Sequence, residues 1–443
     1  MPALLLCSFL ATQQAHSAPT IQEGNIIRDS EIEAILLEIM HPIFKVAGLD
    51  PKQLNLYIVA SSEINAAASI DYSIFINTSL ITRAKNLDEV VGVLAHETGH
   101  LSLGHVARFQ DSIQRSSLIA MASAALGIAA AIAGSPDAAM GAMMAGQQIA
   151  MGSLMHYSQG QEASADQAAV RFLDKLGWTA KGLESFMAYL AKQELRGRDR
   201  QDAYMRTHPL SSLRVDMLNS AIGQLKKQGK PLPGRLYERF DRMVVKIKAF
   251  MNSPMKTLMQ HPPSKTATLD RYGRAIAYYR NGDLKNSLAE LNPLLAQNPK
   301  DPYLHELKGQ ILFDNGKLVA AHQAYQRAVS LAPNSPLIRL AAVQTMLELP
   351  QVDLTKALRE LHLVLRKESK NPLAWHLLAV IYGKQGHKGL LALALSEKAL
   401  TLNDLDLALS QAKRALHLSK DKTALIRAKD IVELILEEQK KRG

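Results

Sequence analysis

The stretch "VVGVLAHETGH", residues 90–100, predicts a helix that carries two histidines four positions apart. A helix turns by about 100° per residue, so His96 and His100 lie on one face, one turn apart. Their imidazoles can bind a single metal ion, and Glu97 lies beside that point, where a carboxylate can accept and return a proton. The pattern is short enough to arise by chance, so the rest of the chain has to supply a third ligand.

The residues around this stretch predict a small unit of mixed helix and strand. Residues 30–48 form a predicted helix that ends at a glycine. Residues 54–61 and 72–80, "LNLYIVAS" and "YSIFINTSL", are rich in β-branched and aromatic side chains, which is typical of strands. Asn86 predicts the start of the histidine-bearing helix, which we expect to extend to about Gln114.

The nearest candidate for a third metal ligand is His105, five residues after His100. On a continuous helix this spacing turns the side chain about 140° away from His100. His105 is therefore expected to be a packed or surface histidine rather than a ligand.

A second candidate lies in "YSQGQEASADQAAV", residues 157–170, where Glu162 and Asp166 share one helix face. One carboxylate could bind the metal directly, and the other could hold a ligand imidazole through its second ring nitrogen. The alternative is an acidic helix start that only interacts favourably with the helix dipole. The residues alone leave both interpretations open.

The second half of the chain repeats itself. Pro299 and Pro333 are 34 positions apart, which is the period of tetratricopeptide repeats. Such an array pairs antiparallel helices and presents a concave surface for binding other proteins. The predicted units span about 268–301, 302–335 and 336–371, another begins at Pro372, and 404–440 forms a terminal helix pair. The second unit has small, aromatic and proline residues at the positions typical of the repeat: Gly309, Ala321, Tyr325, Ala328 and Pro333.

Composition favours a mainly helical protein of two or three domains. The chain has 443 residues, of which 47% are hydrophobic and 5% aromatic, and 52 basic against 41 acidic side chains give a formal net charge of +11. No basic run with interleaved aromatic residues is present, so we predict no binding of nucleic acid. Cys7 is the single cysteine, which excludes a disulfide within the chain and a cysteine-based metal site.

Residues 1–18 resemble a secretory signal peptide, with an apolar stretch followed by small and polar residues. The first basic residue is Arg28, so the charged start of the signal is missing and the N-terminus is expected to be truncated. Export through such a signal would place the protein in the periplasm.

Residues 118–155 are almost free of charge and consist of two apolar pieces around "GSPD". Each piece is shorter than the roughly 20 residues that span a bilayer. We expect a helical hairpin whose two arms are buried or packed together, and peripheral contact with a membrane is the alternative.

Three motifs together carry a family resemblance. "HETGH", "YSQGQEASAD" and "THPLSSLR" (residues 207–214) resemble the zinc peptidase family that includes HtpX and the CAAX prenyl proteases, and "INAAAS" (64–69) resembles its Asn-Ala segment. With the repeats appended, the chain is most similar to the soluble periplasmic BepA-type branch. The resemblance implies a mainly α protein: a gluzincin-type α+β metalloprotease domain with a small sheet over 19–255, a linker over 256–268, and an α-helical tetratricopeptide-repeat solenoid over 269–440.

The resemblance also implies roles for individual residues. One zinc ion would lower the pKa of a water molecule and polarise the scissile carbonyl. The implied zinc ligands are His96, His100 and Glu162, the general base and acid is Glu97, and Asp166 would brace a ligand histidine. His208 would stabilise the oxyanion or fill the open position of the metal, and Arg214 would be a structural or oxyanion-side cation.

The implied function is a zinc-dependent endopeptidase of the bacterial cell envelope that hydrolyses misfolded or stalled envelope and outer-membrane proteins. Its repeats would dock protein substrates or the outer-membrane assembly machinery. The alternative is a latent protease that acts mainly as a periplasmic chaperone or adaptor through its repeats. For the active enzyme we expect the strand "SIFIN", residues 73–77, to bind extended substrate along its edge.

Overall fold

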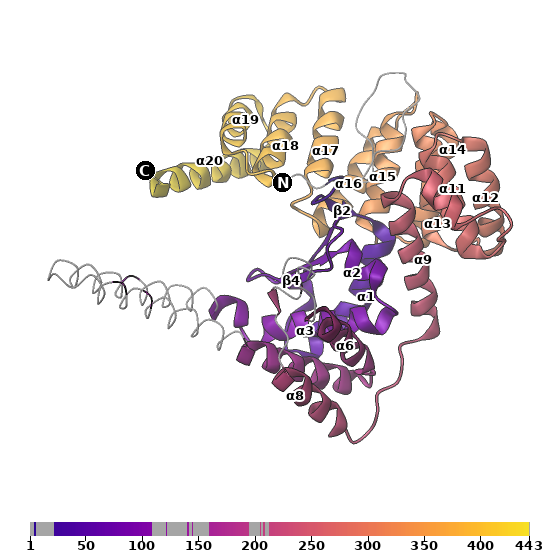
Figure 1. Ribbon diagram of the computed structural model, residues 1–443. Helices are drawn as coiled ribbons and strands as arrows, with labels where there is room; N and C mark the ends of the chain where they lie inside the picture. The colour runs from indigo at the N-terminus through magenta and orange to yellow at the C-terminus, as the bar shows by residue number, and fades with distance from the viewer. Residues whose placement is uncertain are drawn as a thin grey trace. The chain divides into compact units, whose positions relative to one another are not determined.

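The computed structural model describes residues 22–108, 159–194 and 212–442, together with positions 4, 5, 121, 140, 144, 204, 207 and 208. Apart from isolated positions, the expected signal peptide and the expected apolar hairpin lie outside the described residues. The chain forms two compact units, one made mainly of Ile32–Lys248 and the other mainly of Ala249–Gly443 (Figure 1). Among the described helices, none combines the length and the apolar composition needed to cross a bilayer.

The first unit contains a small mixed sheet. Its central strands, β3 (Asn55–Val59) and β5 (Ser73–Asn77), are parallel and lie in the two segments predicted as strands. The second prediction extended too far, because helix α2 (Thr78–Arg83) begins directly after β5. The outer strands are β2 (Ile26–Arg28) beside β3 and β4 (Ala66–Ala68) beside β5, both antiparallel, and a two-residue strand β1 (Leu4–Leu5) precedes them in the chain.

The position of β5 corrects the expectation that this strand binds substrate along its edge. Both of its edges are already hydrogen-bonded, one to β3 and the other to β4. Among the described strands, β4 forms the sheet edge on this side. Its sequence is Ala-Ala-Ala, and alanine is a poor strand former, which is why no strand was predicted there.

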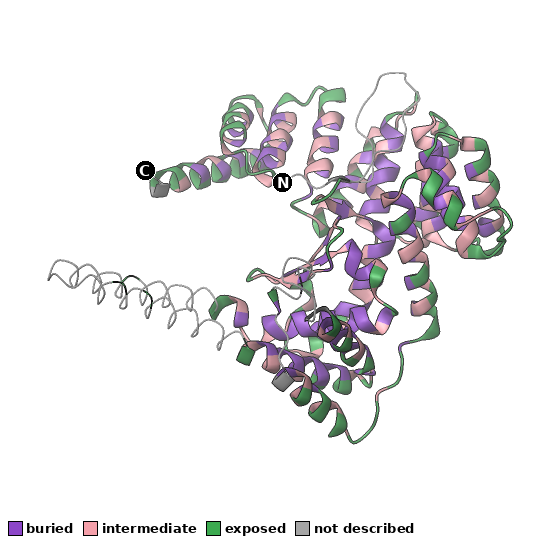
Figure 2. Cartoon of the chain, viewed as in Figure 1, coloured by how far each residue is buried: buried purple, intermediate pink, exposed green. Residues whose placement is uncertain are grey.

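Helix α3 (Leu87–Ser102) lies at the centre of this unit. The Asn86 side chain accepts the Glu89 N–H at 3.2 Å, which confirms the predicted start of the helix. Nearly every residue of α3 is buried (Figure 2), and the helix packs against α6 (Lys181–Glu194) and β4. The other helices of this unit are α1 (Ser30–Val46), a helix over 159–176, α8 (Ser212–Gly223) and α9 (Gly234–Met251).

Helix α3 ends earlier than predicted. It stops at Ser102, and Gly104 adopts a left-handed φ of +66°, a conformation that favours glycine and commonly ends helices. Residues 105–108 then form a new helical turn, and 109–114 lie outside the described residues. The expectation of one continuous helix to Gln114 is therefore wrong, because the glycine redirects the chain after Leu103.

The second unit is the predicted array of helix pairs. Small residues allow the close packing within a pair: a Cβ on Gly309 would lie 2.8 Å from the Tyr325 ring, and Ala321 and Ala328 are fully buried. The helices are α11 (Thr268–Arg280), α12 (Leu284–Gln297), α13 (Pro302–Asp314), α14 (Leu318–Leu331), α15 (Pro336–Leu347), α16 (Leu354–Lys367), α17 (Pro372–Lys384), α18 (Lys388–Thr401), α19 (Leu405–Leu418) and α20 (Lys422–Arg442).

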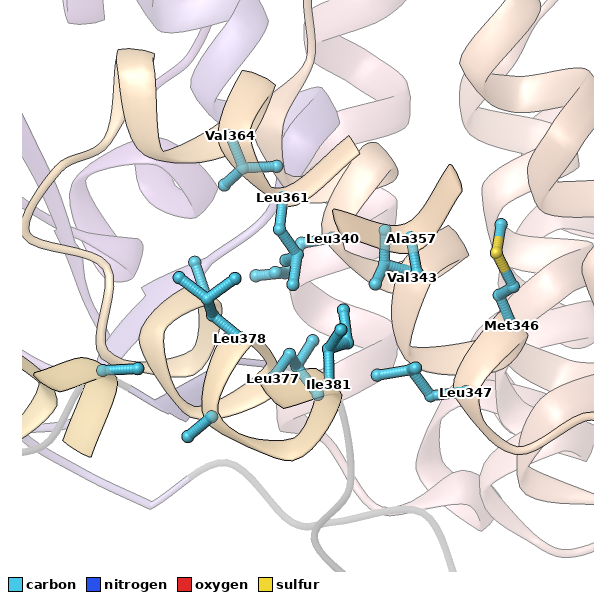
Figure 3. Packing of buried hydrophobic residues seen from close by; sticks show 13 residues of the cluster. Leu340, Val343, Met346, Leu347, Ala357, Leu361, Val364, Leu377, Leu378 and Ile381 are labelled. Atoms are coloured by element: carbon cyan, nitrogen blue, oxygen red, sulfur yellow. The ribbon is translucent and has the colours of Figure 1, made fainter. Parts of the chain in front are cut away.

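Each pair buries apolar side chains against its neighbour. Figure 3 shows one such cluster, in which Leu340 and Val343 of α15 pack on Leu361 of α16 and Ile381 of α17. These four side chains are at most 1% exposed. The array therefore has a continuous core built from consecutive helices, as expected for a repeat solenoid.

The segment expected to be a linker, residues 256–268, begins inside a helix. Helix α10 (Pro254–Gln260) starts at Pro254, which suits the first helical position because proline lacks an N–H there. The Ser253 side chain caps it by accepting the Lys256 N–H. The irregular part of this segment is thus limited to the residues between α10 and α11.

Candidate metal centre

Two helices distant in sequence bring three ligand groups to one point. His96 and His100 project from α3, and their Nε2 atoms are 3.0 Å apart. Glu162, on the helix over 159–176, places Oε2 3.3 Å from Nε2 of His96 and Oε1 3.3 Å from Nε2 of His100. Tetrahedral zinc with bonds of about 2.0–2.1 Å has ligand atoms about 3.3 Å apart, so this donor set fits a single small cation.

The close approach of the two helices depends on Gly99. A Cβ at this position would lie 2.9 Å from the Ala165 carbonyl oxygen and 3.2 Å from its Cα. Gly99 lies on α3 between the two histidines, and Ala165 lies between the two acidic residues of the other helix. The absence of a side chain at Gly99 thus sets the separation at which the imidazoles reach the carboxylate.

Replacing Gly99 by alanine should push the two helices apart. We expect a loss of about 1–3 kcal/mol in the free energy of unfolding, as for other overpacked positions, and weaker metal binding. Gly160→Ala is the matched control, because a Cβ at Gly160 meets nothing within 4 Å. Urea unfolding and metal titration of both variants test this, and equal stability of the two would contradict it.

Asp166 and Arg214 support the ligand group from behind. The Nδ1 of His96 donates to Asp166 Oδ1 at 2.7 Å, which leaves Nε2 of this ring for the metal. Arg214 contacts Asp166 through Nε (2.5 Å) and Nη2 (3.0 Å), and its Nη1 lies 3.0 Å from Glu162. Arg214 is 2% exposed and interacts with both carboxylates, which partly compensates their buried charge.

The buried charges shift one another's pKa. Burial lowers the pKa of His96, but the carboxylates of Asp166 and Glu162 outweigh it and raise this pKa to about 10. Burial alone would raise the pKa of Glu162, yet the neighbouring histidines, His208 first, hold it well below its ordinary value. A metal-binding imidazole has to be unprotonated at its ligating nitrogen, so a cation that binds here competes with protons.

Glu97 lies beside the ligand group and is 1% exposed. The hydroxyl of Tyr204 donates to Glu97 Oε1 at 3.2 Å, and Nε2 of His208 lies 3.6 Å from the same oxygen. The rings of Tyr204 and His208 stack with centroids 4.4 Å apart. Tyr204 was not predicted as a site residue; its position four residues before His208 is the signal in the sequence that points to it.

His208 lies within the ligand group itself. Its Nδ1 is 3.0 and 3.2 Å from the two carboxylate oxygens of Glu162. Among the described residues, one cluster has the composition and spacing to hold a metal ion, and its donor atoms lie within 4.8 Å of one another: His96, His100, Glu162 and His208. The structure thus brings together four candidate ligands, where a catalytic metal needs three protein ligands.

His105 is buried rather than exposed, and it contacts a ligand residue. Its Nδ1 lies 3.1 Å from Nδ1 of His100, although a continuous helix would have turned it away. Burial, and then the neighbouring His100, lower the pKa of His105 to about 4. The turn at Gly104 brings the His105 side chain next to His100 of α3. Residue spacing on a continuous helix could not predict this contact.

All seven residues named from the sequence as site residues converge in this cluster, and each is at most 8% exposed. The structure brings together residues from three separate parts of the chain: His96, Glu97 and His100; Glu162 and Asp166; His208 and Arg214. Their individual roles in binding and catalysis stay predictions.

Comparison with protein families gives two matches. The model of peptidase family M48 matches residues 27–222, which include all of these site residues. A tetratricopeptide repeat model matches residues 272–336. The order of the two matches along the chain agrees with the two units of the structure.

Curated relatives combine the same features. The beta-barrel assembly-enhancing protease of Yersinia pestis is 25% identical over 335 residues, which cover 75% of this chain and 68% of that protein. The protein of the same name from Escherichia coli K12 is 24% identical and is covered to 66%, with 73% of this chain matched. Metalloprotease LoiP of Escherichia coli K12 is 28% identical over 48% of this chain and 77% of its own length. The chain thus matches about two thirds of the length of the beta-barrel assembly-enhancing proteases.

Among solved structures, a thermophilic tetratricopeptide-repeat protein from Thermus thermophilus matches 38% of this chain and 99% of its own, at 18% identity and a TM-score of 0.25. Yeast Tom70 matches 70% of this chain and 62% of its own, at 12% identity and a TM-score of 0.27. The repeats follow from the match to the tetratricopeptide repeat model and from the succession of helix pairs.

Proposed function

From a peptidase family M48 domain over residues 27–222 and the tetratricopeptide repeats that follow it, we propose that this protein is a zinc-dependent endopeptidase of the bacterial cell envelope. The convergence of His96, His100 and Glu162 beside the buried carboxylate of Glu97 is the observation that supports the proposal most strongly. Two imidazoles and one carboxylate form a donor set that suits zinc.

When bound, zinc would supply Lewis-acid polarisation of the peptide carbonyl and a water molecule of lowered pKa. Glu97 takes the proton from the attacking water and delivers it to the nitrogen of the departing amine. The hydrogen bond from Tyr204 fixes one oxygen of Glu97, which leaves the other oxygen to receive that proton. Asp166 and Arg214 hold His96 and Glu162 in place, so we assign Arg214 to positioning rather than to contact with substrate.

The edge strand β4 is the place where an extended substrate can bind. A peptide can add to a free sheet edge through main-chain hydrogen bonds, and β4 packs against α3, the helix that carries Glu97.

The relatives' name, beta-barrel assembly-enhancing protease, supports a role in the quality control of outer-membrane proteins. Misfolded or stalled envelope proteins are therefore the substrates we propose, and the expected signal peptide is consistent with delivery to the periplasm. The helix pairs of the second unit would dock these substrates or the assembly machinery, since such arrays bind other proteins.

The names of the relatives support an active protease over the alternative function, a latent protease that acts through its repeats. One feature of the site bears on that alternative. His208 lies within the ligand group, and as a fourth ligand it would occupy the position that water and substrate need. Glu162 and Glu97 both lie near its ring nitrogens, and these contacts would hold His208 at that position.

The test is cleavage of casein and of a denatured outer-membrane β-barrel protein by the purified full chain. We expect hydrolysis that a chelator abolishes and stoichiometric zinc restores. We expect His208→Ala to cleave faster than the wild type if His208 closes the site. Cleavage that persists in the metal-free protein would refute the zinc mechanism. Zinc binding without cleavage in both wild type and His208→Ala would favour the adaptor function.

A further inference from the structure

The two histidine ligands need different partners behind them. A metal-binding imidazole that uses Nε2 carries its proton on Nδ1 and usually donates it to a neighbouring group, which fixes the ring. For His96 that neighbour is Asp166. For His100 no carboxylate lies at Nδ1 among the described residues; the atom found there is Nδ1 of His105, at 3.1 Å.

The surroundings of Nε2 of His105 indicate which of the two imidazoles donates the hydrogen bond between them. Its Nε2 lies 3.4 Å from Oγ of Ser164, and that hydroxyl donates its own proton to the carbonyl of Gly160 at 2.8 Å. Ser164 therefore presents a lone pair, so His105 donates from Nε2 and has Nδ1 free to accept. Gln161 adds a hydrogen bond from its side chain to the His105 carbonyl at 3.3 Å.

We propose that His105 is a positioning residue that accepts the Nδ1–H of His100 and thereby directs Nε2 of His100 to the metal. The proposal rests on the metal site proposed above. The resulting chain runs from His100 through His105 to Ser164, and it ties the end of α3 to the helix that supplies Glu162. One ligand histidine is thus held by a carboxylate and the other by a neutral imidazole.

The course of the backbone places the His105 side chain beside His100. His105 can reach His100 only because α3 ends at Ser102 and Gly104 turns the backbone with a φ of +66°. The side chain is 6% exposed, although it lies at the start of a short helical turn. Packing alone would not require both of its ring nitrogens to face polar partners.

The test compares His105→Leu with His105→Asn in the full chain. Leucine fills a similar volume without an acceptor, whereas the asparagine oxygen can occupy the position of Nδ1. We expect His105→Leu to weaken zinc binding about 10–100-fold, as loss of such a partner does elsewhere. We expect His105→Asn to bind zinc within about threefold of the wild type, which corresponds to less free energy than a typical hydrogen bond contributes. Competition with a chromophoric zinc chelator measures both.

His41→Leu serves as the control, because His41 is an exposed histidine on α1 in the same unit. Thermal unfolding of the metal-free variants reports whether the fold is intact. Unchanged zinc affinity in His105→Leu would overturn the proposal, and so would equal weakening in His105→Asn at unchanged metal-free stability. If His105→Leu does not fold, Ser164→Ala takes its place, and unchanged zinc affinity there would also overturn it.

Because zinc affinity is measured without substrate, the outcome is separate from peptide hydrolysis. A wild-type protein that binds zinc but cleaves no peptide would contradict the proposed endopeptidase and leave the role of His105 measurable. A wild-type protein that binds no zinc would overturn both.

Discussion

Replacement of Glu97 by glutamine is expected to lower kcat for peptide hydrolysis by about 10²–10⁴-fold while zinc stays bound. The amide keeps the size of the side chain and can still accept the hydroxyl of Tyr204, which lies 3.2 Å from Glu97 Oε1. It cannot take up a proton from water, so the step that depends on a general base is lost. Steady-state cleavage of a peptide substrate, with the zinc content measured in the same samples, tests this result.

The matched control for this variant is Glu184→Gln. Glu184 is an exposed carboxylate on α6, a helix that packs against α3 without contributing to the ligand group. Its replacement should leave both kcat and zinc content unchanged. Cleavage by Glu97→Gln at the wild-type rate, with zinc present, would show that another group acts as the base.

Replacement of Arg214 by methionine should destabilise the metal-free protein by about 3–5 kcal/mol. Arg214 is 2% exposed and interacts with the carboxylates of Asp166 and Glu162. Its removal leaves two buried negative charges with less compensation, and methionine replaces the aliphatic part of the side chain but not the guanidinium. Urea unfolding in the presence of a chelator measures the effect.

The control is Arg171→Met, because Arg171 is exposed on the helix that carries Asp166. We expect its free energy of unfolding to change by about 0.5 kcal/mol or less, as for ordinary surface substitutions. Equal stability of the two variants would contradict a structural role for Arg214.

The decrease in the free energy of unfolding caused by Arg214→Met should depend on pH. Burial raises the pKa of Asp166, but His96 and Arg214 outweigh this and hold it below its ordinary value of 3.8. The stability that Asp166 contributes is therefore present above pH 3.8 and is lost as pH falls through its lower folded-state pKa. Without Arg214 this pKa rises, so the difference between wild type and Arg214→Met should shrink as the pH falls to about 4 and below.

Local signals were sufficient for the repeats and for the first two ligands. Asp301 and Asn371 cap their helices and are followed by proline at the first helical position, so the boundaries of α13 and α17 follow from neighbouring residues. The spacing of His96 and His100 likewise fixes their relation within one helix turn. These features depend on residues at most a few positions apart, so helix geometry is enough to predict them.

The sheet and the second set of ligands depended on distant contacts. The sequence of β4 does not favour a strand, and it becomes one because β5 offers a free edge. Glu162 was equally compatible with a simple acidic helix start, because the long stretch of chain between His96 and Glu162 gives no information about their distance in space.

By itself, the sequence determined the start of α3, the repeat array and the imidazole pair on α3. Only the tertiary structure decided which carboxylate meets that pair and which group lies behind each imidazole. The physical reason is steric: at Gly99 the helices lie so close that a Cβ would meet the Ala165 backbone, and Gly104 turns His105 back toward His100. The first effect depends on two residues that are far apart in the chain. The second depends on a change of backbone direction at Gly104.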